Sequence, residues 1–472
     1  MYPLNIVDNV RSVDVLVMLT SIDHLIWGPP LLILLVGTGL YLTYLLRFIQ
    51  ILKLPTALGY VLRRGRGDGI EGDISSVAAL ATALAATIGT GNIVGVATAI
   101  QMGGPGALFW MWIAAFFGMA TKYSECLLAV KYRTVDENGQ MSGGPMYYIR
   151  HGLGHKPYSE PLARFFAISG IGVAFFGIGT FPQINAIVDS ASLTFHMPVP
   201  YTAAIVITLV ALVIIGGIRS IARVAMIVVP FMAVAYVIGC VLVIAMNFDS
   251  LWPTLTLIVR SAFSPTAAAG GFLGSTMILA MQMGIARGVF SNESGLGSAP
   301  IAAAAARVKE PARQGLISMT GTFFDTIIIC TMTGIVLIMT GSWKSELAGA
   351  YMTGHAFSSV LGSLGSYLVG LGLIFFAFTT ILGWNYYGER CTEFLVGVKG
   401  ILPYRIIYIT MVASGAFLTI DVIWVLADIV NGLMVIPNLI ALIALRKIIV
   451  SETQKFFGSQ EKAEVDLQSM NT

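Results

Sequence analysis

Long apolar segments separated by short polar loops run through the whole chain. Eleven segments approach or exceed the roughly 20 residues that cross a bilayer as a helix. They lie at 24–46, 73–102, 107–131, 163–190, 201–217, 222–246, 270–306, 315–340, 362–388, 404–419 and 422–445. We therefore predict an all-α polytopic membrane protein with eleven transmembrane helices. Residues 1–22 are expected to form an interfacial segment, 23–447 one transmembrane domain, and 448–472 a polar, disordered cytoplasmic tail.

Two of these segments are interrupted by glycine and polar residues. The segment 73–102 carries Gly-Thr-Gly-Asn at 89–92, and the run 281–300 contains four glycines, an arginine and a glutamate. Glycine costs a helix about 1 kcal/mol relative to alanine, so both runs favour local unwinding. Unwound backbone at membrane depth is tolerated only where it is buried in protein or lines a cavity. Close packing of small residues between helices is the alternative explanation.

The interrupted segments occupy corresponding places in two halves of the chain. If the first span is an appendage, they become the first and sixth helices of a ten-helix core, with one repeat at 73–246 and the other at 270–445. Each half then has five spans, which fits an inverted repeat. Paired interrupted helices of this kind are the best pointer in a sequence to a transport site. The pattern therefore predicts a secondary transporter.

Composition and charge agree with a membrane protein and narrow its class. Of the 472 residues, 56 % are hydrophobic and 11 % are charged, against about 25 % charged in soluble domains. The net charge of +3 gives no reason to expect nucleic acid. Lys and Arg gather in alternate loops, while the opposite loops hold only Arg11, Arg260 and Lys344. This asymmetry predicts an outside N-terminus and a cytoplasmic C-terminus.

The sequence gives little support to other classes of membrane protein. The four cysteines show no metal-ligand spacing, and no nucleophile or histidine cluster suggests an enzyme or an organic cofactor. A channel should show a continuous polar pore stripe, and a receptor should carry a signalling domain. Neither feature is visible, so a channel and an amino-acid-sensing receptor are the less favoured readings.

Three polar motifs inside or beside the apolar segments resemble those of the alanine/glycine:cation symporter family. They are TIGTGNIVGV at 87–96, GGPMYY at 143–148 and FSNESGLGS at 290–298. The resemblance extends over about residues 25–445 and departs from the common family pattern at Ser294, where alanine is frequent. It implies a LeuT-type fold and symport of small neutral amino acids, alanine or glycine, with Na⁺ across the cell membrane. Glutamine or serine as substrate, and H⁺ as coupling ion, remain alternatives.

A zwitterionic substrate needs donors for its carboxylate and acceptors for its ammonium, and an unwound helix supplies both. We expect Gly89, Thr90 and Gly91 to hold the carboxylate. The second interruption is placed at 281–284, which adds Gln282 and Gly284 to the substrate contacts.

The resemblance adds two more substrate contacts. They are Gln183, as a polar contact, and Trp384, as a wall that excludes bulky side chains. An interhelical hydrogen bond for Gln183 and an interface anchor for Trp384 are the structural alternatives.

The resemblance also implies one Na⁺ between the first interruption and the segment 362–388. Carbonyl and hydroxyl oxygens suffice for such an ion. The nominated ligands are Ala85, Ile88, Ala377, Thr379 and Thr380. Thr379 and Thr380 are adjacent, so one hydroxyl faces the ion, and we favour Thr380. A second Na⁺ would use Thr87 and Asn92. Threonine hydroxyls bonded to carbonyls one turn earlier are the structural alternative.

Charged residues inside the spans are functional candidates by default. Lys122 and Glu125 have the spacing of a helical ion pair. Arg287 and Glu293 are expected to form an inner gate, with a static packing pair as the alternative. Asp325 is the candidate for tuning an ion or proton site. We expect a monomer in the lipid bilayer.

Overall fold

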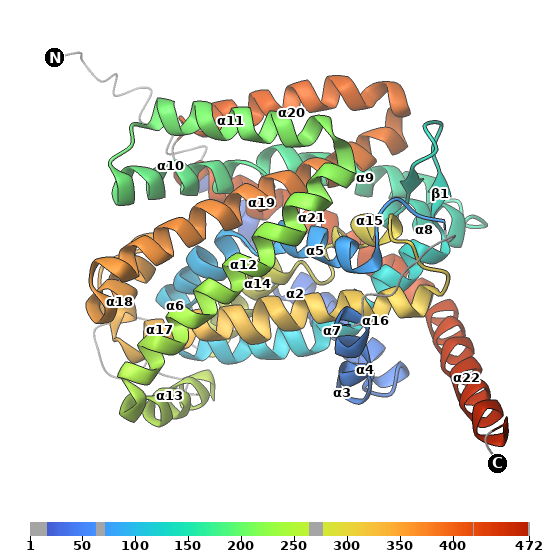
Figure 1. Ribbon diagram of the computed structural model, residues 1–472, viewed down its shortest axis with the longest axis horizontal. Coiled ribbons are helices and arrows are strands. Elements are labelled where there is room, and N and C mark those ends of the chain that lie inside the picture. The colour runs from blue at the N-terminus through green and yellow to red at the C-terminus, as the bar shows by residue number, and fades with distance from the viewer. Residues whose placement is uncertain (1–16, 63–70, 264–276, 419, 471–472) are drawn as a thin grey trace.

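The computed structural model describes residues 17–62, 71–263, 277–418 and 420–470. Figure 1 shows helices that run mostly side by side, with a short hairpin at one end of the bundle. Among the described residues, strands are confined to this hairpin, β1 (Thr134–Val135) and β2 (Met141–Ser142). The expected all-α membrane class is therefore confirmed. The predicted interfacial segment 1–22 lies mostly outside the described residues.

The first half of the chain begins with a helical stretch, Val17–Leu45, that includes α2 (Pro29–Leu45). Two short helices follow, α3 (Ile49–Leu52) and α4 (Leu54–Leu62). The remaining helices of this half are α5 (Ser76–Thr87), η1 (Gly91–Gly95), α6 (Val96–Gly103), α7 (Gly106–Lys131), α8 (Pro145–Gly152), α9 (Ser159–Phe176), α10 (Phe181–Phe195), α11 (Val199–Ile215) and α12 (Gly217–Met246).

The second half has a similar succession of helices. It comprises η2 (Phe248–Ser250), α13 (Leu251–Phe263), α14 (Met277–Asn292), α15 (Ala299–Ala304), α16 (Pro311–Thr322), η3 (Phe323–Cys330), α17 (Thr331–Met339), η4 (Ser342–Lys344), α18 (Gly349–Leu361), α19 (Ser363–Val396), η5 (Val398–Gly400), α20 (Ile401–Gly415), α21 (Ile420–Ala444) and α22 (Arg446–Met470). Here η1 and η3 are π-helical turns, and the other η elements are 3₁₀ helices.

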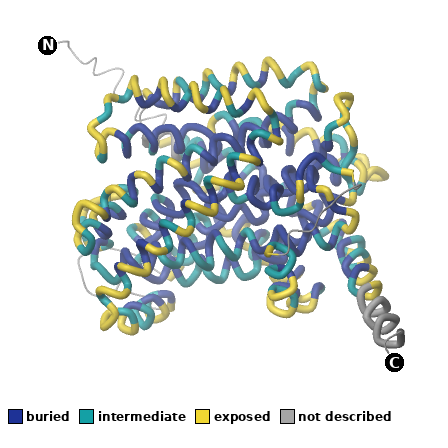
Figure 2. Tube along the Cα trace, in the orientation of Figure 1, coloured by how far each residue is buried: buried dark blue, intermediate teal, exposed yellow. Residues whose placement is uncertain are grey.

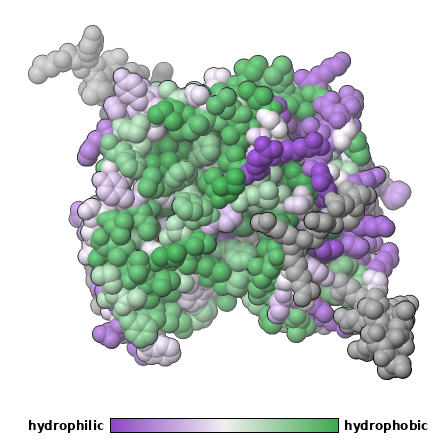
Figure 3. Space-filling view, in the orientation of Figure 1, coloured by the Kyte–Doolittle hydropathy of each residue, from purple (hydrophilic) through white to green (hydrophobic). Residues whose placement is uncertain are grey.

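Each expected span contains helical structure. Within the described residues, seven helices are long and apolar enough to cross a membrane, or eight if α5 and η1–α6 count as one bent span. The outer face of α12 carries exposed apolar side chains at Ile227, Phe231 and Val234. Figure 3 shows hydrophobic side chains over much of this view and hydrophilic ones gathered at the end that carries the hairpin. This distribution is that of a protein surrounded by lipid along its length.

Both interrupted segments are broken, but the second break is not where the sequence placed it. The first helix bends by 53° between α5 and Gly91–Gly103. The second breaks at residues 293–298, where Glu293, Gly295 and Gly297 have φ values of 56°, 93° and 84°. The predicted break at 281–284 lies inside the continuous helix α14 and is wrong. Glycine in a helix interior is tolerated, whereas positive φ at two glycines forces the chain out of the helix.

The two broken helices pack with α7, α16 and α19 in the buried centre of the molecule. α7 lies along α14 and α16, while α19 contacts α5, α9, α10 and α12. Figure 2 shows this centre as continuous buried chain. The N-terminal span packs on α7 and α21 at its side. The centre thus places both breaks away from lipid.

The tail expected to be disordered is instead a helix. α22 projects from the bundle in Figure 1, and its first turns lie against α7. The Tyr123 hydroxyl lies 2.8 Å from that of Thr453, and Lys131 forms an ion pair with Glu452 at 2.9 Å. The hydrogen bond from Lys131 holds the pKa of Glu452 below its usual range. These contacts give the first turns of this polar segment tertiary support.

Candidate functional site

The first break brings a hydroxyl group of α19 to two backbone carbonyls of the other helix. Thr380 Oγ1 lies 3.1 Å from the carbonyl oxygen of Ala85 and 3.4 Å from that of Ile88. The Phe376 carbonyl on its own helix lies at 3.0 Å. Unwound backbone carbonyls are the ligands that transporters use for Na⁺. This set of neutral oxygens therefore fits a monovalent cation.

The neighbouring residues on α19 lie differently. Thr379 Oγ1 donates to the same Phe376 carbonyl at 3.0 Å, so the back-bonded arrangement holds for both threonines, but Thr379 makes no contact of this kind to α5 among the described residues. Ala377 is buried three residues before Thr380. Of the two adjacent hydroxyls, Thr380 is the one that reaches α5.

Gln183 lies against the first break, as the resemblance implied. Its Oε1 accepts the Thr90 backbone N–H at 3.2 Å, and its Nε2 donates to Thr90 Oγ1 at 3.0 Å. A Cβ added at Gly89 would lie 2.5 Å from Thr380 Oγ1, and one added at Gly91 would lie 2.9 Å from Ser291 Cα. The absence of side chains at both glycines lets neighbouring helices approach the unwound backbone. Gly89, Thr90, Gly91 and Gln183 thus meet at one place.

The side chain of Asn92 stabilises the break and connects it to η3. Its Oδ1 accepts the Gly89 N–H at 2.9 Å, and its Nδ2 donates to Asp325 Oδ1 at 2.7 Å. Thr87, the other residue proposed for a second ion, donates instead to the Leu84 carbonyl at 3.3 Å. No hydrogen bond joins Thr87 to Asn92, and the acidic partner of Asn92 is Asp325.

Asp325 is buried where the two broken helices meet. Besides Asn92, its carboxylate accepts from Ser291 Oγ at 2.9 Å and from Thr326 Oγ1 at 2.7 Å. Ser291 belongs to the last turn of α14. One carboxylate therefore connects the first break to the helix that leads into the second, which gives Asp325 a central place in the candidate site.

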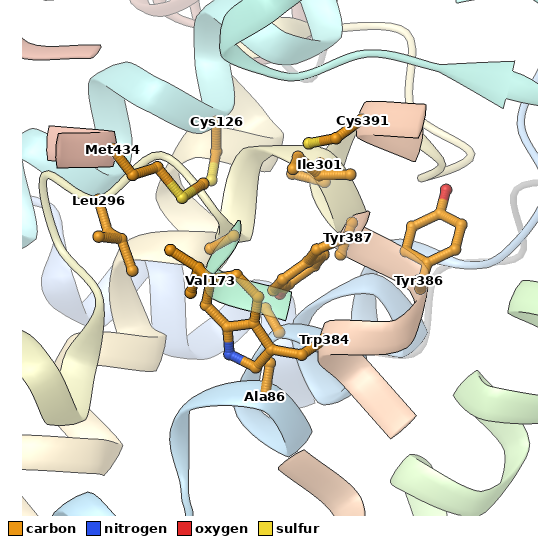
Figure 4. Close-up of a cluster of buried hydrophobic side chains, with 14 of the residues drawn as sticks. Ala86, Cys126, Val173, Leu296, Ile301, Trp384, Tyr386, Tyr387, Cys391 and Met434 are labelled. Atoms are coloured by element: carbon orange, nitrogen blue, oxygen red, sulfur yellow. The ribbon is translucent and has the colours of Figure 1, made fainter. Parts of the chain in front are cut away.

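Trp384 and Glu293 form a buried hydrogen bond between α19 and the second break. Trp384 Nε1 donates to Glu293 Oε1 at 2.8 Å, and the Ser298 hydroxyl donates to Glu293 Oε2. Trp384 is fully buried, which excludes the interface-anchor alternative. Figure 4 shows its indole among buried side chains that include Ala86, Val173 and Tyr387. Trp384 lies one helical turn beyond Thr380 and next to α5.

A second buried carboxylate supports the second break. Glu125 Oε1 accepts the Gly295 N–H at 3.0 Å and also binds the Asn438 side chain. Tyr148, the last residue of the 143–148 motif, donates to Asn438 Oδ1. This motif therefore helps to fix the second break through α21. Lys122 does not pair with Glu125 as expected, because its Nζ has no hydrogen-bond partner among the described residues.

Three residues of the predicted site lie elsewhere on α14. Gln282 Nε2 donates to the Trp27 carbonyl at 3.4 Å, and Gly284 packs against Ala107 of α7. The structure does not bring either of them to a break. Arg287 does not pair with Glu293. It forms a bidentate pair with Asp428, at 3.0 Å from Nη1 to Oδ1 and 2.7 Å from Nη2 to Oδ2.

Sequence reasoning missed two residues that the structure makes prominent, Asn438 and Arg133, and marked Asp428 only as a helix-end or polar-core group. Asp428 is the partner of Arg287, and Asn438 joins Glu125 to Tyr148. Arg133 donates to backbone carbonyls of residues 71, 304, 306 and 308, so it holds together the chain before α5 and the chain after α15. Asp428 and Asn438 are polar residues inside an apolar span, which was the available signal. Arg133 carried no such signal.

The chain is similar to known transporters over almost its whole length. The model of the sodium:alanine symporter family matches residues 13–470. An uncharacterized transporter of Haemophilus influenzae is 62 % identical over 93 % of this chain and 95 % of its own length. The sodium/alanine symporter AgcS of Methanococcus maripaludis is 48 % identical over 94 % of this chain and 97 % of its own length.

A solved structure shares the fold. The crystal structure of MhsT in complex with L-phenylalanine superposes with a TM-score of 0.56 at 11 % identity, over 82 % of this chain and 93 % of that chain. The sequence relatives are transporters rather than enzymes. The chain therefore belongs to the sodium:alanine symporter family and is a multi-pass membrane transporter with the LeuT-type fold.

Proposed function

We propose that this protein imports alanine or glycine together with Na⁺ by alternating access. The observation that carries the proposal is the position of Thr380 Oγ1 between the carbonyls of Ala85 and Ile88. These oxygens join α19 to the broken helix, whose backbone N–H groups at Gly89 and Thr90 are held by the side chains of Asn92 and Gln183 rather than by the helix itself. A cation bound there and an amino acid bound at the same break stabilise each other's site, which is the basis of coupled transport.

The substrate carboxylate binds the backbone N–H groups at Gly89, Thr90 and Gly91, where a helix begins after the break. Without substrate, the Thr90 N–H is occupied by Gln183 Oε1 and the Gly89 N–H by Asn92 Oδ1. A bound carboxylate takes over these N–H groups, and the Gln183 amide then turns its Nε2 toward the ligand. Trp384 limits the side chain of the substrate to a small size.

The moving part consists of α5–α6, α7, α14–α15 and α16–α17, and we call it the rocking bundle. It moves against a scaffold that includes α9, α10, α19 and α20, in a ten-helix core of two inverted repeats preceded by one span. Thr380 belongs to the scaffold, whereas Ala85 and Ile88 belong to the rocking bundle. A bound cation therefore connects the scaffold to the rocking bundle at the interface that must move during transport. We place the protein in the cell membrane as a monomer, with its N-terminus outside.

The decisive experiment is uptake of labelled alanine and glycine into proteoliposomes. An imposed Na⁺ gradient is compared with a pH gradient in Na⁺-free buffer, with glutamine and serine as competing substrates. Uptake driven by Na⁺ and inhibited best by alanine or glycine is the expected result. Uptake driven only by the pH gradient would reject sodium coupling, and preference for glutamine would reject the substrate assignment.

Thr380→Val tests the proposed ion ligand, with Thr379→Val as the matched control one residue away. A hydrogen bond or ligand to a charged group contributes about 1.5–3 kcal/mol, so the Na⁺ concentration for half-maximal uptake should rise by at least about tenfold. Among the described residues, Thr379 bonds within its own helix alone, and its replacement should change that concentration by less than about threefold. Equal effects of the two substitutions would remove Thr380 from the site.

A further inference from the structure

The ammonium group of Lys122 is buried in the bundle without a hydrogen-bond partner among the described residues. The residue lies on α7 and is 2 % exposed. An ammonium has three donors to satisfy, and a buried charge persists only where opposite charge compensates it. In a membrane protein such a residue is a functional candidate. The groups that compensate Lys122 therefore indicate what it does.

The buried carboxyl group of Glu125 lies one helical turn from Lys122, three residues along the same helix. Glu125 Oε1 accepts the Gly295 N–H, a neutral donor in the second break. Glu125 Oε2 is buried and, like Lys122 Nζ, lacks a hydrogen-bond partner among the described residues. The acidic group that supports the second break thus has a cation of the protein on its own helix.

The two breaks differ in how they carry charge. At the first, Thr380, Ala85 and Ile88 present neutral oxygens to a cation that comes from solution. At the second, the buried carboxyl group of Glu125 lies one helical turn from a lysine of the same helix. Asp325 stands between the breaks and bonds to Asn92 and Ser291.

We infer that Lys122 is a built-in cation that balances Glu125 beside the second break, so that only the first break takes up a cation from solution. Lys122 is on this view a positioning residue for the second break and touches neither substrate nor ion. The inference rests on the proposed symport function and adds to it which break is used for coupling. It predicts that removal of the ammonium creates a demand for a further cation.

The test compares wild-type protein with Lys122→Met in proteoliposomes. Without the ammonium, the buried carboxylate of Glu125 remains uncompensated, and the transport-competent state must take up one H⁺ or Na⁺ from water. If H⁺ is taken up, uptake at constant Na⁺ should fall about tenfold from about pH 6 to about pH 8, because the required proton is lost as pH rises. If Na⁺ is taken up, the Hill coefficient for Na⁺ at constant pH should rise by about one. Wild-type uptake should change less than about twofold over the same pH range.

Other titratable groups face this cluster and are kept unchanged in the comparison. They are Cys126 on α7, Glu293 in the second break, Asp325 on η3, Tyr148 on α8 and Tyr387 on α19. Because they are present in both proteins, a new pH dependence or a steeper Na⁺ dependence of Lys122→Met belongs to the loss of the ammonium.

Further variants distinguish the loss of the buried charge from a general effect on folding. Lys122→Arg keeps a cation and should retain the wild-type pH and Na⁺ profiles. Lys131→Met removes an ammonium from the same helix, where it pairs with Glu452 outside the bundle, and should also retain them. If Lys122→Met does not reach the membrane, Lys122→Met/Glu125→Gln should do so, because it removes one buried charge of each sign. Failure of that double variant to restore the protein would overturn the inference.

The outcomes for the inference and for the proposed function are distinct. No Na⁺-driven uptake by wild-type protein would reject the proposed function. Na⁺-driven uptake by wild type, together with wild-type pH and Na⁺ profiles in a folded Lys122→Met protein, would reject the built-in cation alone.

Discussion

At the scale of single residues, the first break depends on two glycines that allow close approach. The space beside Gly91 is filled by α14, because an added Cβ would lie 2.9 Å from Ser291 Cα and 3.2 Å from Ser291 Cβ. The same serine donates to Asp325. A methyl group at Gly91 must therefore push apart the broken helices at the place where their polar groups meet.

Gly91→Ala should weaken uptake strongly while leaving protein in the membrane. Overpacking a filled site costs about 1–3 kcal/mol, which corresponds to a rise of roughly 5- to 150-fold in the substrate concentration for half-maximal uptake. Gly95→Ala is the matched control, because its Cβ would meet only the Thr90 carbonyl at 4.0 Å. Uptake by Gly91→Ala that equals that of Gly95→Ala would contradict the substrate assignment.

Polar residues and glycines inside apolar segments were enough to predict the contact at Thr380 but not the position of the second break. Residue matching nominated Thr380 with Ala85 and Ile88, and the structure brings their oxygens together; Na⁺ binding there stays a prediction. The second break was predicted at the wrong place, so Gln282 and Gly284 lie inside a continuous helix. A sequence does not distinguish a glycine inside a helix from a glycine at a break. Only backbone conformation, set by tertiary packing, distinguishes them.

At the scale of elements, each break is supported by a carboxylate from an adjacent helix of the rocking bundle. Glu125 of α7 binds the second break at Gly295, and Asp325 of η3 binds the first through Asn92. Hydrophobic periodicity predicted the helices and their order, because apolar length is a local property. It did not predict the helical tail α22, which depends on contacts with α7. Pairings between distant parts of the chain, such as Glu125 with Asn438, leave no local pattern.

The pair between Arg287 of α14 and Asp428 of α21 links the rocking bundle to a helix outside it. Both side chains are mostly buried, at 14 % and 10 % exposure, and the contact is bidentate. Loss of one partner leaves an uncompensated charge and costs about 3–5 kcal/mol. Asp428→Asn should therefore reduce uptake more than tenfold, measured with labelled alanine at saturating Na⁺.

The exchanged pair Arg287→Asp/Asp428→Arg shows whether transport needs the ion pair between the two helices or needs either residue for another reason. Restored charge pairing should recover a substantial part of the uptake that Asp428→Asn loses, because the two helices regain an ion pair. Arg287→Lys is the matched control, since it keeps charge but not the bidentate geometry. Wild-type uptake by Asp428→Asn, or no recovery in the exchanged pair, would show that transport does not depend on the ion pair between α14 and α21.

At the scale of the whole molecule, alternating access requires that some helix contacts persist while others change. The contact between α9 and α19 lies within the proposed scaffold, and that between α5 and α19 lies at the boundary with the rocking bundle. A covalent link at each place should therefore have opposite consequences for transport. The chain offers a suitable pair of positions at both.

Gly170→Cys should form a disulfide with the native Cys391 and still transport. A Cβ at Gly170 would lie 3.7 Å from Cys391 Cβ and 2.7 Å from its Sγ, close to the Cβ separation of about 3.8 Å in disulfides. The link joins α9 to α19 inside one rigid unit, so uptake after oxidation should stay within about twofold of the reduced protein.

The comparison pair is Ala86→Cys/Gly383→Cys, whose Cβ atoms would be 2.7 Å apart and need a shift of about 1 Å. This link joins α5 to α19 and should stop uptake until a reductant is added. Uptake that survives the second link, or is lost with the first, would mean that the boundary between moving and fixed helices runs elsewhere in the molecule.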